Sequence, residues 1–175
     1  MIWLFNFFFM AKPYQNAVSI CVILSVLALI GILAGGYYHS PLITIILLLP
    51  TVGYEVYRTE GESTKWASWA LLALFIAEFI LIVFNISYDL ASFLQRSEEY
   101  IAGYTVPLGD IKIVGPALMA VLSIILFIRT AGVYTKWLAV IIFITSFALI
   151  YSLDATVFER YLKLAIDQGL NNLNL

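Results

Sequence analysis

Long apolar stretches with few or no charges constrain this chain more than any other feature of its sequence. Residues 17–37 contain no charged residue, and residues 66–88 are interrupted only by Glu78. Two further apolar stretches cover residues 113–128 and 134–153. A helix needs about 20 mostly apolar residues to cross a hydrocarbon core roughly 30 Å thick. The sequence therefore predicts membrane-spanning helices at these four places.

The composition supports the same fold class. Of 175 residues, 63% are hydrophobic and 11% are charged, and the mean hydropathy is +0.99. A soluble domain is closer to half apolar and a quarter charged, and a disordered chain is poorer still in apolar residues. We therefore expect an all-α integral membrane protein.

Charge and residue counts exclude several function classes. The net charge of −2 is too small for nucleic-acid binding, which requires a basic face. Cys21 and His39 are the only cysteine and histidine, too few for a zinc cluster, a cysteine-ligated iron–sulfur cluster or a bis-histidine haem. No nucleophile–base pair can be assembled either. We expect no metal site, no cofactor and no enzymatic activity.

An internal repeat organises the chain. Residues 58–66 read RTEGESTKW and residues 129–137 read RTAGVYTKW, and the two segments share Arg, Thr, Gly, Thr, Lys and Trp in register. A weaker Gly-Tyr…Pro-Leu match lies upstream of each segment. Such self-similarity indicates a duplicated structural unit. We assign the two copies to residues 36–88 and 103–153, each a helical hairpin.

The repeat predicts a fifth span. Residues 41–57 are apolar but short, and Pro50 interrupts them, so alone they fit either a span or a re-entrant segment. Their counterpart in the second copy ends at Ile128 and reads as a span. We therefore expect about five transmembrane helices, namely a leading helix over 17–37 and two tandem hairpins, with both RTxGxxTKW turns in one compartment.

The Lys and Arg residues near the ends of the spans only weakly indicate how the chain is oriented in the membrane. The side with both turns carries five of them and the opposite side carries four. By the positive-inside rule, we expect a cell-membrane protein with the turns in the cytoplasm.

Three segments flank the spans within a single membrane domain, 1–175. Segment 1–16 combines Trp and Phe with Lys12, which predicts an interfacial helix; the alternative is that it extends the first span, although Pro13 opposes this. The connector 89–102 and the tail 154–175 show apolar residues at helical spacing. We expect amphipathic helices that lie on the membrane or dock on a partner.

The two turns contain the clearest charged candidates. Thr64 and Thr135 are expected to cap the following helices. The basic residues of the turns are Arg58, Lys65, Arg129 and Lys136. Lys beside Trp is typical of residues at a membrane interface. Two alternatives remain. The four basic residues together form a site for an anion or a lipid headgroup, or they contact a partner subunit.

Glu78 lies near the middle of its span, where a carboxylate is costly and should face protein or water. Its counterpart in the second copy is Leu149. Three interpretations are open: a proton or cation site, a contact with another subunit, and a protonated carboxyl bonded to a neighbouring helix. Glu55 precedes Arg58 by three residues, which favours a local ion pair.

Gly31 and Gly35 form a GxxxG pattern on the first span, which favours close helix packing. Taken together, these features predict a small accessory or structural subunit of a larger membrane complex. An energy-transducing complex is favoured only because such complexes are frequent, and no motif in the sequence indicates one. The alternative is a small oligomeric transporter or channel that uses Glu78. The expected partners are the lipid bilayer and other membrane subunits or further copies of the chain.

Overall fold

A computed structural model describes residues 16–59, 61–86, 98–101, 104–107, 111–156, 158–159 and 163. The elements in chain order are α2 (Ala17–Tyr37), α3 (Pro41–Arg58), α4 (Glu62–Val83), β1 (Glu98–Ile101), β2 (Tyr104–Pro107), α6 (Ile111–Arg129) and α7 (Val133–Leu153). The interfacial segment expected over 1–16 lies almost wholly outside the described residues, as does most of the tail 154–175.

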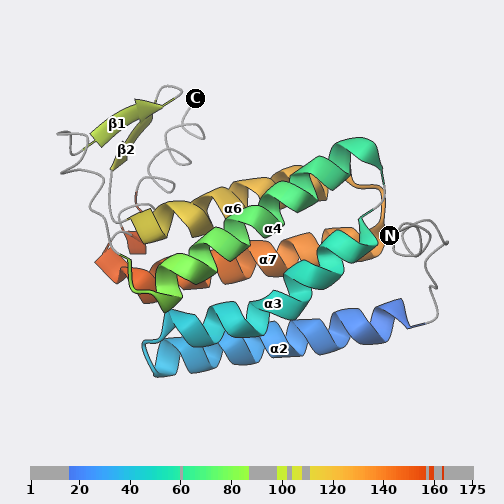
Figure 1. Ribbon diagram of the computed structural model, residues 1–175, viewed down its shortest axis with the longest axis horizontal. Coiled ribbons are helices and arrows are strands. Elements are labelled where there is room, and N and C mark those ends of the chain that lie inside the picture. Colours follow the sequence, from blue (N-terminus) through green and yellow to red (C-terminus); the bar gives the residue numbers. More distant parts are fainter. Residues whose placement is uncertain are drawn as a thin grey trace.

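The five long helices of the described part lie side by side in one bundle (Figure 1). Helices α3, α4, α6 and α7 form a ring, in which each contacts the next: α3 with α4, α4 with α6, α6 with α7, and α7 with α3. Helix α2 packs on the outside of this ring, against α3 and α7. The fold is therefore a four-helix ring with one added helix.

Four of these helices are long and apolar enough to cross a membrane, namely α2, α4 from Thr64 onward, α6 and α7. This agrees with a multi-pass membrane protein. Helix α3 is the shortest of the bundle at 18 residues, and it contains Pro50, Glu55 and Arg58. At 1.5 Å per residue it is about 27 Å long. It is the one long helix of the described part that is not among these four.

The ring has the contact pattern expected of two equivalent hairpins. Exchanging α3 with α6 and α4 with α7 converts the α4–α6 contact into the α7–α3 contact, and both contacts are present. The turn from α3 to α4 and the turn from α6 to α7 lie at the same end of the bundle (Figure 1). Helix α2 begins at that end too, and the α2–α3 turn lies at the other.

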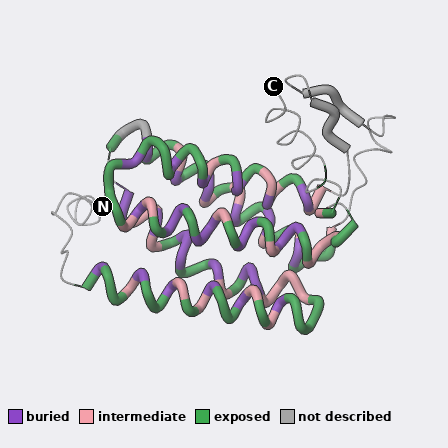
Figure 2. The backbone as a smooth tube through the Cα atoms, turned by 180° about the vertical axis from the view of Figure 1, so that it is seen from behind, coloured by how far each residue is buried: buried purple, intermediate pink, exposed green. Residues whose placement is uncertain are grey.

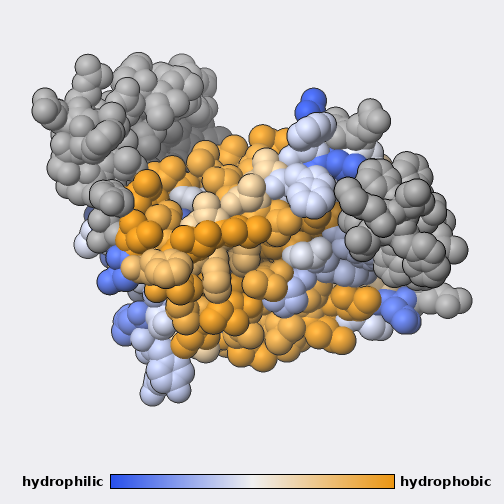
Figure 3. Space-filling view, in the orientation of Figure 1, coloured by the Kyte–Doolittle hydropathy of each residue, from blue (hydrophilic) through white to orange (hydrophobic). Residues whose placement is uncertain are grey.

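The core of the bundle consists of apolar side chains from all four ring helices, including Leu48, Phe75, Met119 and Ile142. A second, smaller cluster joins α2 to α7 through Cys21 and neighbouring side chains. Buried positions alternate with exposed ones at helical spacing along each helix (Figure 2). The face shown in Figure 3 is also apolar over the middle of the bundle, whereas hydrophilic residues gather at its two ends.

The connector expected to be an amphipathic helix over 89–102 is different at its C-terminal end. Glu98–Ile101 form strand β1, which pairs antiparallel with Tyr104–Pro107. This hairpin is rich in the aromatic and β-branched residues Tyr100, Ile101, Tyr104, Thr105 and Val106, which favour strands over helices. The helical expectation was therefore wrong for 98–101, and residues 87–97 lie outside the described part.

Candidate functional site

The two repeated turns have matching hydrogen bonds. Gly61 and Gly132 are the N-cap residues of α4 and α7, and neither cap has a side-chain hydrogen bond. Thr64 Oγ1 donates back to the carbonyl of Gly61 at 3.0 Å, and Thr135 Oγ1 to that of Gly132 at 2.8 Å. The threonines were expected to be N-caps, but they occupy the third helical position instead. This geometry fits the side chains, since a hydroxyl in the first turn can reach the preceding carbonyl.

Arg58 connects the first turn to the second hairpin. It is the last residue of α3, and only 7% of its surface is exposed. Its guanidinium carbon lies 4.7 Å from the ring centroid of Tyr134 on α7, and Nη1 donates to the Tyr54 hydroxyl at 3.5 Å. The guanidinium therefore contacts the ring of one tyrosine, where cation–π attraction favours it, and the hydroxyl of another.

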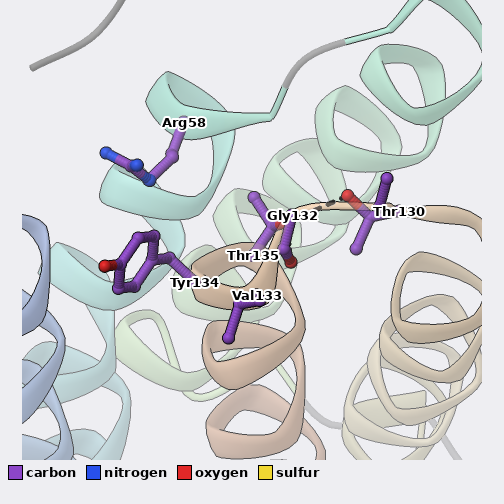
Figure 4. Close-up of a pocket in the computed structure, with 7 residues that line it drawn as sticks. Arg58, Thr130, Gly132, Val133, Tyr134 and Thr135 are labelled. Carbon is purple, nitrogen blue, oxygen red and sulfur yellow. Dashed lines mark hydrogen bonds between the residues drawn. The ribbon is translucent and has the colours of Figure 1, made fainter. Parts of the chain in front are cut away.

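A cavity of about 380 Å³ opens beside Arg58 (Figure 4). The other lining residues are Thr130, Ala131, Gly132, Val133, Tyr134 and Thr135. Helix α7 begins at this wall and has no acidic residue in its first turn. A helix N-terminus carries partial positive charge, which adds to the charge of Arg58. The wall of the cavity is therefore electropositive.

The other three basic residues of the turns do not line this cavity. Lys65 and Arg129 are exposed. Lys136 is half-buried, with Nζ 5.7 Å from the ring centroid of Phe127. The structure thus brings all four cations to one end of the bundle, but it places only Arg58 of the four at the cavity.

Glu78 is buried on the inner side of α4, with 1% of its surface exposed. It faces Gly115 of α6, where an added Cβ would collide with the Glu78 carboxylate. Its counterpart Leu149 is equally buried, at 0%. The two hairpins therefore use the same inward position for a carboxylate in one copy and for an apolar side chain in the other.

Glu55 forms a second buried carboxylate site, although its spacing from Arg58 along the helix favours a local ion pair. The carboxylate is fully buried, and its Oε1 accepts hydrogen bonds from Thr59 Oγ1 at 2.6 Å and from Ser68 Oγ at 2.8 Å. Ser68 belongs to α4, so the bond joins the two helices of the first hairpin. Arg58 turns instead towards Tyr134. The ion-pair expectation was therefore wrong.

The repeat register contains the signal that could have revealed this site. Glu55 corresponds to Leu126, and Ser68 corresponds to Ala139. Both counterparts are buried, at 1% exposure each. A polar pair in one copy thus replaces an apolar pair in the other, which indicates that the two polar residues contact each other.

Gly31 and Gly35 lie in the contact between α2 and α3. A Cβ at Gly31 would lie 3.1 Å from Leu47 Cβ, and one at Gly35 would collide with Thr44 Oγ1. The Thr44 hydroxyl donates to the carbonyl of Gly31 at 3.0 Å. The small residues therefore allow both close approach and an interhelical hydrogen bond, as in other helix pairs with this pattern.

The described residues contain no cluster of three or more His, Cys, Asp or Glu side chains that could hold a metal ion. Comparison with known proteins found no matching family model, no matching curated protein and no matching solved structure.

Proposed function

We propose that the chain is a multi-pass membrane protein that crosses the bilayer five times. The four long apolar helices support four of these crossings. The fifth is α3, whose inclusion is supported by its place in the ring between α4 and α7 and by its length of about 27 Å, close to the hydrocarbon thickness. Both basic turns then lie in one compartment, for which we propose the cytoplasm.

We further propose that the protein acts as an accessory or structural subunit within a larger membrane assembly. The observation that carries this proposal is the filled interior of the ring. Leu48, Leu71, Met119, Ile142 and Leu149 each have 0% exposed surface and come from all four ring helices. Because close-packed side chains leave little room for a solute, the outer faces of the bundle are better suited to function than its centre.

The outer face of α2 is the part best suited to a partner. Ile23, Leu29 and Leu33 are more than half exposed, at 58%, 55% and 64%. Helix α2 lies outside the ring, so substitutions on this face leave the core of the ring intact. Association of apolar helix faces within a membrane depends on van der Waals packing and close approach.

A photo-crosslinking residue at Ile23 or Leu29, introduced in the native membranes, tests the subunit role. We expect a reproducible crosslink to one different membrane protein and a native particle heavier than any small multiple of the 19.6 kDa chain. The same probe at buried Leu24 is the matched control and should crosslink only within the chain. Crosslinks to lipid or to the chain itself, with a self-only particle mass, would contradict the subunit role.

A second candidate function is that of a small oligomeric transporter or channel, favoured by the buried carboxylate of Glu78. A charged group inside a membrane is costly and commonly marks a pathway for ions or protons. The packed ring requires several copies to surround a pathway, so an oligomer is part of this proposal. Glu78→Gln keeps the shape of the side chain and removes its charge, so it should abolish ion flux in reconstituted vesicles. Unchanged flux with unchanged pH dependence would eliminate this role.

A further inference from the structure

Two hydroxyl groups donate to the carboxylate of Glu55 in the contact between α3 and α4, and a third lies one helical turn away on α3. The first two, Thr59 Oγ1 and Ser68 Oγ, donate to the same oxygen, Oε1. The third belongs to Thr51, which lies four residues earlier and hence on the same face of α3, with Cβ atoms about 5–6 Å apart. Glu55 and Thr51 are both fully buried, at 0% exposed surface.

Two oxygen atoms of this group have no hydrogen-bond partner among the described residues. They are Glu55 Oε2 and Thr51 Oγ1. Buried polar atoms in native proteins almost always have a partner, whether protein, water or ion. A carboxylate with one hydrogen-bonded oxygen and one oxygen without a partner, one helical turn from a hydroxyl that also has no partner, matches the donor set of a small hard cation.

The second hairpin shows that the fold does not need these polar groups. The counterparts of Thr51, Glu55 and Ser68 are Leu122, Leu126 and Ala139. All three pack in the same hydrophobic core as the rest of the ring. The repeat thus contains an apolar version of the same position that packs well, so the polar version is present for a reason other than packing.

We propose that the carboxylate of Glu55 and these three hydroxyls bind one small monovalent cation, H⁺ or Na⁺, between α3 and α4. As a proton site, Oε2 carries the proton and donates a hydrogen bond to Thr51 Oγ1, while Oε1 still accepts its two hydrogen bonds from Thr59 and Ser68. As a sodium site, the hydroxyls rotate so that their lone pairs and both carboxylate oxygens face the ion. The site does not depend on the subunit role proposed above, because it belongs to a single copy of the chain.

Several other titratable side chains lie on the elements around this site. Those that are buried or half-buried, within the described ranges, are Tyr54, Tyr57 and Arg58 on α3, Cys21 on α2, Glu78 on α4, and Tyr134 and Lys136 on α7. Arg58 contacts Tyr134 and Tyr54 rather than the Glu55 carboxylate. A titration must therefore be read at Glu55 itself and not from a global signal.

Dicyclohexylcarbodiimide provides such a reading on the purified full-length protein in detergent. This apolar reagent adds to a protonated carboxylic acid and rearranges to a stable N-acylurea, so peptide mass spectrometry reports labelling separately at Glu55 and Glu78. For either cation, we expect labelling of Glu55 in mildly acidic, sodium-free buffer that falls several-fold as the pH rises. If Na⁺ lowers the labelling of Glu55 further, and choline at equal ionic strength does not, the site binds sodium. If labelling of Glu55 falls with rising pH and does not respond to Na⁺, the site binds a proton.

Two variants keep the test decisive. Thr51→Val preserves the shape of the side chain and removes the open hydroxyl, so it should shift the pH or the Na⁺ concentration of half-labelling. The double variant Glu55→Leu with Ser68→Ala copies the second hairpin and should fold without labelling at position 55. Absence of Glu55 labelling under all conditions, or labelling that ignores pH, Na⁺ and Thr51→Val, would overturn the proposal.

Discussion

The contact between α2 and α3 offers a sharp test of the packing, because two adjacent glycines differ in their surroundings. A Cβ added at Gly35 collides with Thr44 Oγ1 and lies 3.3 Å from both the Ser40 carbonyl oxygen and Thr44 Cβ. A Cβ added at Gly36 meets nothing within 4 Å. Gly35→Ala should therefore destabilise the protein, whereas the matched variant Gly36→Ala should not.

The magnitude follows from the contacts that Gly35→Ala disturbs. Thr44 must rotate or α3 must shift, and overpacking of this kind costs about 1–3 kcal/mol. Rotation also breaks the 3.0 Å hydrogen bond from Thr44 to Gly31, which contributes about 0.5–1.5 kcal/mol. The gain in helix propensity is about 1 kcal/mol for either Gly→Ala change and cancels in the comparison. We expect Gly35→Ala to be less stable than Gly36→Ala by about 2–4 kcal/mol.

Unfolding by dodecyl sulfate in mild-detergent micelles measures this difference. Circular dichroism follows helix content, and tryptophan fluorescence follows detachment of α2, since Trp137 Nε1 on α7 donates to Ser25 Oγ on α2 at 3.0 Å. Adding Thr44→Ala to Gly35→Ala removes the colliding hydroxyl and should recover part of the loss as a positive coupling between the two sites. Equal stability of Gly35→Ala and Gly36→Ala would refute the close packing of α2 on α3.

Two further predictions concern the ring and its orientation. Gly115→Ala should lower the free energy of unfolding by about 1–3 kcal/mol, because its Cβ collides with the Glu78 carboxylate. The same change should cost less in a Glu78→Ala background. Equal costs in both backgrounds, measured by the same unfolding assay, would contradict the contact. In sealed vesicles, Lys65→Cys and Lys136→Cys should react with an impermeant maleimide from one side and Tyr38→Cys from the other, since Cys21 is buried and adds little background. Reaction of the two lysine-site cysteines from opposite sides would contradict five crossings.

Helix positions were the part of the fold most open to prediction. The expected spans 17–37, 113–128 and 134–153 agree with α2, α6 and α7 to within two residues at each end. The reason is that apolar length along the chain is a one-dimensional quantity, read directly from the residues. The strand Glu98–Ile101 was missed, because a short segment with mixed apolar and charged residues fits helical and strand spacing alike.

The repeated turns were also visible in the sequence, but the roles of their residues were not. The identical Thr64 and Thr135 suggested N-caps, whereas each lies three residues after a glycine cap. The four basic residues looked equivalent, yet Arg58 is buried and Arg129 is exposed. The two arginines differ because Arg58 finds Tyr134 on a neighbouring helix, a partner that sequence proximity does not indicate.

The sequence by itself determined where the long apolar helices of the described part lie and that the RTxGxxTKW segment occurs twice, since length, hydropathy and identity are properties of the residues in order. Only the tertiary structure decided which side of each helix faces inward. Helix α4 is apolar on all sides, so its sequence pattern does not indicate that Ser68 points into the ring; for Glu78, only the cost of a carboxylate in lipid favoured an inward position. Contacts between helices set that direction, and they place Glu55 beside Ser68 rather than beside Arg58.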